Sequence, residues 1–206
     1  MPSYNWSVNP INLIQQFEAR HNSPTAGALL MWAVSAVDCI YYLDDIDREF
    51  DNSRVSLAGH KPDVIDIAHA RWATGTSITA VDLCAAGLGR TFCGHRGKHE
   101  FNLGSFDPSS KQSKAAAKCR AQMPIQAQNW VDSVIHDSQY NVVKSARDWL
   151  THSRLPRHFN VAIGGPPQRL ELGINSNKLP VRNLIELARD FASRHVFSFI
   201  QLLPQI

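Results

Sequence analysis

The sequence lacks several features that would define its class at once. It has 4 cysteines in 206 residues, and their spacing shows no pairing pattern, so a disulfide framework is not expected. No apolar run approaches the roughly 20 residues that cross a bilayer. The N-terminal stretch MPSYNWSVNP has neither the basic nor the apolar part of a signal peptide. We therefore expect a cytoplasmic protein that does not enter a membrane.

Charge is also scarce, and it is unevenly distributed. Charged residues make up 19% of the chain and hydrophobic residues 44%, a composition that suits one domain over 1–206 with its own buried core. The net charge is only +3, but acidic residues dominate 1–50 and basic residues dominate 109–160. The basic half favours a polyanionic partner.

Helical periodicity dominates what is present. Spacing and proline-led starts predict helices at about 10–20, 24–49, 62–93, 124–136, 138–152 and 180–203. The acidic run DDIDREFD is expected to form a solvated helix end. In the helix over 138–152, the spacing predicts one core stripe of apolar side chains: Val142, Val143, Ala146, Trp149 and Leu150.

Two segments depart from the helical pattern. Residues 94–122 are rich in glycine, serine and lysine, which predicts a mobile loop. The stretch FNVAIGGPPQRLELGI alternates in polarity around a Gly-Gly-Pro-Pro turn, which predicts a β-hairpin within 158–174. The expected fold is therefore all-α, an up-and-down helical bundle with a β-hairpin inserted before the last helix.

The polar side of the helix over 138–152 carries the first candidate site. Arg147 and His152 lie on its two flanks, about 140° apart, with Asp148 between them. Asp148 and His152 are four positions apart, so the carboxylate can orient the imidazole. Arg154 and Arg157 follow the helix. The alternative to a functional site is an ordinary solvated helix end, whose cations interact favourably with the helix dipole.

Two other sets of residues compete with this one. Arg189, Asp190 and His195 form a similar set, with the histidine six positions after the arginine instead of five. His195 is in line with apolar residues of the last helix, so we expect a packing histidine. Cys93, His95 and His99, with Cys119 downstream, supply donors that suit zinc, although no standard ligand spacing is present. A zinc-binding protein is thus the alternative of another class.

The stretch RDWLTHSRLP resembles the motif of HEPN-domain proteins, the nucleotide-binding family of higher eukaryotes and prokaryotes. Their motif is an arginine, then Asn, Asp or His, then a histidine a few residues later, often followed by Leu-Pro. Arg147, Asp148, His152 and the pair Leu155-Pro156 match these positions. The family's fold, a bundle of four or more helices with the motif near its C-terminal end, is similar to the pattern over about 125–203.

This resemblance implies a metal-independent endoribonuclease without a cofactor, usually a homodimer in which two motifs meet. His152 would take the proton from an RNA 2′-hydroxyl, Arg147 would bind the phosphate, and Asp148 would orient the imidazole. Arg154 and Arg157 would hold flanking phosphates. Such proteins serve as toxins or in defence, often with a cognate antitoxin as partner. The alternative within the family is a bundle that binds RNA, a nucleotide or a partner without cleaving.

Overall fold

The computed structural model describes residues 24–56, 62–93, 101–108, 114–152, 171–174 and 177–206, with a few isolated helical positions before residue 24. The chain divides into two compact units. Unit 1 comprises Met1–Ile40, Thr79–Asp137 and Ala192–Ile206, and unit 2 comprises Tyr41–Ile78 and Ser138–Phe191. The expectation of a single domain stays a prediction.

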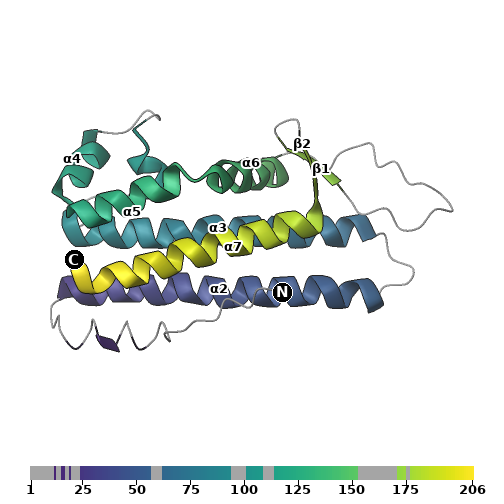
Figure 1. The fold of residues 1–206 in the computed structure, drawn as a ribbon, viewed down its shortest axis with the longest axis horizontal. Coiled ribbons are helices and arrows are strands. Elements are labelled where there is room, and N and C mark those ends of the chain that lie inside the picture. The colour runs from purple at the N-terminus through teal and green to yellow at the C-terminus, as the bar shows by residue number, and fades with distance from the viewer. Residues whose placement is uncertain are drawn as a thin grey trace. The chain divides into compact units, whose positions relative to one another are not determined.

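The described part of the chain is all-α, with one short hairpin before the last helix, and this confirms the predicted class (Figure 1). In chain order, the helices are α2 (Pro24–Ser56), α3 (Pro62–Cys93), α4 (Lys114–Gln122), α5 (Ile125–Ile135), α6 (Ser138–His152) and α7 (Val181–Leu202). Two 3-10 turns, η1 (Leu103–Phe106) and η2 (Leu203–Gln205), complete the helical elements. None of the helices in the described ranges could cross a membrane.

Unit 1 has an apolar core to which its helices each contribute. Gly87 of α3 is a point of close approach, because an added Cβ would lie 3.1 Å from Leu29 Cδ1 and 3.1 Å from Trp32 Cβ of α2. On α5, Trp130 packs against Phe199 of α7 with ring centroids 5.0 Å apart. Other fully buried core residues of this unit are Ala33, Ala36, Val81, Leu88, Val131, Val134, Val196 and Ile200.

The predicted mobile loop over 94–122 is wrong for most of its length. Residues 94–100 and 109–113 lie outside the described residues, but η1 and α4 are ordered elements within it. Leu103 and Phe106 of η1 are fully buried, and the Leu103 N–H donates to Asp82 Oδ1 at 2.9 Å. Arg120 of α4 donates to the Phe106 carbonyl oxygen at 3.0 Å. Two apolar anchors and charged hydrogen bonds therefore order a segment whose composition is that of a loop.

In unit 2, α6 and α7 pack through the faces that the helical spacing selects. On α6 the buried residues are Tyr140, Val143, Ala146 and Leu150, whereas the predicted core residues Val142 and Trp149 are half-exposed. Ser77 Oγ of α3 donates to the Ala188 carbonyl oxygen of α7 at 2.8 Å. The other buried residues of this unit include Leu43, Ile67, Ala70, Ile78, Leu184, Ile185 and Phe191.

The hairpin before α7 lies later in the chain than predicted. Strand β1 (Glu171–Ile174) pairs antiparallel with β2 (Asn177–Pro180), with Ile174 opposite Asn177. The expected partner of residues 171–174 was the chain before Gly164, so the predicted hairpin over 158–174 is wrong, and 158–170 lie outside the described residues. A Pro-Pro pair lacks the N–H donors that strand pairing uses, a property that the predicted hairpin left out of account.

Most charged residues of the acidic run on α2 are exposed, as predicted, but the run does not end the helix and one of its carboxylates is buried. The helix continues to Ser56, and within the run Ile46 and Phe50 are buried. Asp47 is only 8% exposed and pairs with Arg182, at 2.8 Å from Nη1, and with Arg189. Both arginines belong to α7. Their positive charges offset the charge of a carboxylate that the local sequence predicts to be exposed. Asp47 is thus a structural residue of unit 2.

Candidate functional site

The candidate site lies on the last two turns of α6, in unit 2. The buried residues of this helix occupy one face, so Arg147, Asp148 and His152 belong to the remaining surface, as the sequence predicts. Arg147 lies at the edge of the buried face, with its side chain 35% exposed. His152 is the last residue of the helix and is exposed. The side of α6 opposite its buried face is therefore accessible enough to form a surface site.

Arg147 and Asp148 contact each other directly. Arg147 Nε lies 2.8 Å from Asp148 Oδ1, which is close enough for an ion pair. The N–H does not point at this oxygen, however, and Nε is shielded from solvent without a hydrogen-bond partner among the described residues. A shielded donor that lacks an acceptor is costly and needs a physical explanation, of which a role in binding or catalysis is one.

The structure does not join Asp148 to His152. Both residues are described, and no hydrogen bond connects them, although their spacing allows one. The physical reason is competition: the guanidinium next to Asp148 is a permanent cation, which a carboxylate prefers to an exposed imidazole. The predicted orienting contact is therefore absent from this arrangement. Arg154 and Arg157, the predicted phosphate-binding residues, lie outside the described residues.

A residue of another helix contacts this end of α6, and no sequence motif predicted the contact. Arg71 of α3 directs both Nε and Nη2 at the carbonyl oxygen of Leu150, with an Nε–oxygen distance of 2.9 Å. The two residues are 79 positions apart, and Arg71 belongs to no motif. Its side chain meets the backbone of the same turn that carries His152.

The rival set built on His195 is a packing arrangement, as predicted. In unit 1, His195 is 5% exposed, and its Nε2 lies 2.8 Å from Asp137 Oδ2. Burial lowers the pKa of His195, and the bond to Asp137 opposes this shift only in part. Trp130 Nε1 donates to the His195 carbonyl oxygen at 3.0 Å. Arg189 pairs with Asp47.

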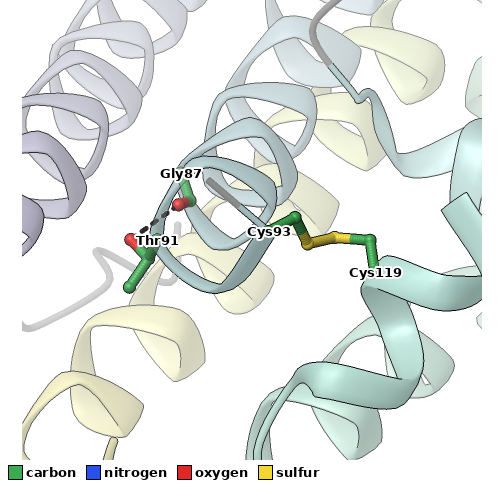
Figure 2. Close-up of a disulfide and its surroundings, with 4 residues drawn as sticks. All are labelled: Gly87, Thr91, Cys93 and Cys119. Carbon is green, nitrogen blue, oxygen red and sulfur yellow. Dashed lines mark hydrogen bonds between the residues drawn. A yellow bond between two sulfur atoms is a disulfide. The ribbon is translucent and has the colours of Figure 1, made fainter. Parts of the chain in front are cut away.

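The sequence predicts no disulfide framework, and the structure contains one disulfide that the cysteine spacing did not indicate. Cys93, at the end of α3, forms a disulfide with Cys119 of α4, with a Cα–Cα distance of 5.2 Å (Figure 2). Just before it, Thr91 Oγ1 donates to the Gly87 carbonyl oxygen at 2.9 Å. The bond joins the end of α3 to the segment that η1 and α4 order. Such bonds are more common in oxidising compartments than in the cytosol.

This disulfide also bears on the zinc alternative. It occupies two of the four sulfur and nitrogen donors, and a disulfide sulfur is not a thiolate ligand. His95 and His99 lie outside the described residues. Within the described ranges, no group of three or more potential ligands is positioned for a metal ion.

Comparisons with known proteins identified no relative of this chain. No family model, no curated protein and no solved structure matches this chain. The resemblance of RDWLTHSRLP to the HEPN motif therefore stays a prediction.

Proposed function

We propose that the protein is a metal-independent endoribonuclease whose catalytic residues lie at the C-terminal end of α6. The observation that carries this proposal is the state of Arg147. Its guanidinium lies at the edge of the buried face, with Nε shielded and lacking a hydrogen bond, one and a half turns before an exposed histidine. An arginine in this state has unused donor capacity for a phosphate.

In the proposed reaction, a phosphate of the RNA takes the place of Asp148 against Arg147. The released carboxylate is then four positions from His152, within reach of its imidazole. His152 accepts the proton of the 2′-hydroxyl while the 2′-oxygen bonds to phosphorus. The bond from phosphorus to the 5′-oxygen breaks, and that oxygen takes a proton from water. Arg147 stabilises the charge that develops on the phosphoryl oxygens.

A homodimer completes the proposal. Arg147 and His152 lie on opposite flanks of one helix, so a two-fold axis that brings two α6 ends together would pool both residues in one cleft. The partner is RNA, and the basic segment over 109–160 suits it. We propose a toxin or defence role, with a cognate antitoxin as a further partner.

The test uses single-stranded RNA and a DNA of the same sequence, both incubated with the purified protein in EDTA. We expect cleavage of RNA only, with 2′,3′-cyclic phosphate ends, because the nucleophile is the 2′-hydroxyl. His152→Ala should lower the rate by about 10²–10⁴ while RNA affinity changes little. Arg147→Ala should damage both rate and affinity.

His136→Ala is the matched control, since His136 is also an exposed histidine at the end of a helix, α5. It should cleave at the wild-type rate. Cleavage that is lost in EDTA and returns with zinc would contradict the proposal and favour the zinc alternative. If His152→Ala cleaves RNA at the wild-type rate, the end of α6 is an ordinary solvated helix terminus and not a catalytic site.

A second candidate has one specific observation in its favour. The ion pair between Arg147 and Asp148 leaves His152 without its orienting carboxylate, as expected of a helical protein that binds RNA, a nucleotide or a partner but does not cleave. RNA binding that is weakened by Arg147→Ala, with no cleavage by any form of the protein, would select this candidate.

A further inference from the structure

The C-terminal turn of α6 is held from outside by a side chain of α3, in unit 2. Arg71 Nε lies 2.9 Å from the Leu150 carbonyl oxygen, and Nη2 of the same guanidinium donates to that oxygen as well. Leu150 is two residues from the end of the helix, so its carbonyl has no donor within the helix. The Arg71 guanidinium supplies two donors to this one acceptor.

The contact fixes the part of α6 that is otherwise free to fray. Helix ends lose their regular geometry first, and His152 is the final residue of this one. The Leu150 side chain is 3% exposed and anchors the turn from the core. The bond to its carbonyl anchors the backbone of the same residue. A charged donor at a helix C-terminus is favourable for the helix dipole as well.

We propose that Arg71 is a positioning residue of the site, which acts through the Leu150 carbonyl to hold His152 at a fixed place relative to Arg147. This inference rests on the proposed ribonuclease function. Arg147 is held by its place inside the helix, about one and a half turns before the end. His152 has no such support from a following turn of α6, so Arg71 provides the missing constraint.

Loss of this constraint should affect turnover more than binding. A displacement of about 1 Å at a reacting group can lower a rate by about 10². We therefore expect Arg71→Gln to lower kcat by about 10- to 100-fold, with KM changed by less than about threefold. Arg71→Lys keeps the positive charge but loses the two-donor fork, so its kcat should lie between that of Arg71→Gln and that of wild type.

The second readout does not depend on any activity. Amide hydrogen exchange at residues 149–152 should become at least about tenfold faster in Arg71→Gln, since local opening of this turn becomes easier. Arg48→Gln is the matched control. Arg48 is an exposed arginine of the same unit that makes only a surface pair with Asp45 at 3.1 Å, and its loss should change neither exchange nor kcat.

Each outcome decides the matter. Faster exchange together with a lower kcat and an unchanged KM supports the proposal. Unchanged exchange, or faster exchange with wild-type kcat, overturns it. A raised KM with unchanged kcat and a weaker salt dependence would make Arg71 a phosphate ligand, which also overturns it. If the wild-type protein cleaves no RNA, the ribonuclease proposal and the catalytic part of this inference fall together, while the exchange measurement still decides whether Arg71 fixes the turn.

Discussion

Removal of the disulfide between Cys93 and Cys119 should markedly destabilise the protein. The two cysteines are 26 residues apart, and the chain-entropy relation gives about 3.5 kcal/mol at 25 °C for a loop of this length. For a chain of about this size, each kcal/mol shifts Tm by about 2–4 °C, so the double variant Cys93→Ser/Cys119→Ser should melt about 7–14 °C lower.

Urea unfolding followed by far-UV circular dichroism measures this difference directly. Wild-type protein should lose the same free energy of unfolding when a reductant is added, whereas the double variant should not respond. Peptide mapping without reductant should show Cys93 linked to Cys119. Cys39 and Cys84 should alkylate slowly in the folded protein, because burial raises the pKa of both thiols and leaves little thiolate at neutral pH.

The reasoning is refuted if the reductant changes the wild-type free energy of unfolding by less than about 1 kcal/mol. It is also refuted if mapping finds all four thiols free, or finds Cys39 or Cys84 in the linked peptide. Either result would leave η1 and α4 to be ordered by their apolar anchors and hydrogen bonds alone.

Two further changes test the packing of each unit. Ser77→Ala should lower the free energy of unfolding by about 1–2 kcal/mol in urea titrations, because the Ala188 carbonyl oxygen loses a buried donor; an unchanged midpoint would contradict this. Burial lowers the pKa of His195, so its stabilising contribution is present above about pH 6.5 and is lost as the pH falls through the folded-state value. The free energy of unfolding of the wild type, relative to that of His195→Gln, should therefore decrease as the pH falls below about 6.5, and profiles that stay parallel between about pH 8 and 5 would contradict this.

The sequence alone determined the helical class and much of the local structure. The predicted ranges of the helices over 62–93 and 138–152 agree with α3 and α6, and the apolar spacing correctly selected Val143, Ala146 and Leu150 as core. The packing role of His195 was likewise predictable from its place in the apolar stripe of α7. These features depend on residues three or four positions apart, so the local pattern contains them.

The candidate residues on α6 were also predictable, but their contacts were not. Helical spacing placed Arg147, Asp148 and His152 on the polar side of the helix. It predicted one partner for Asp148, the histidine four positions later, and gave no sign of a contact with the arginine before it. The structure selects the arginine, because the strength of a charged contact depends on side-chain directions that spacing does not specify.

Only the tertiary structure decided which distant residues meet. Asp47 lies in a run of charged residues that predicts solvent exposure. It is buried nevertheless, because two arginines of α7 pair with its carboxylate. Cys93 and Cys119 pair across a segment whose composition predicts a loop. The buried residues Leu103 and Phe106 lie among polar residues in this segment, so no apolar periodicity identifies them. These partners are separated by long stretches of chain, and no local periodicity encodes which of them will be brought together. The same is true of Arg71, whose acceptor is a backbone carbonyl: a carbonyl is identical at every residue, so no side-chain pattern can reveal that this one is the target.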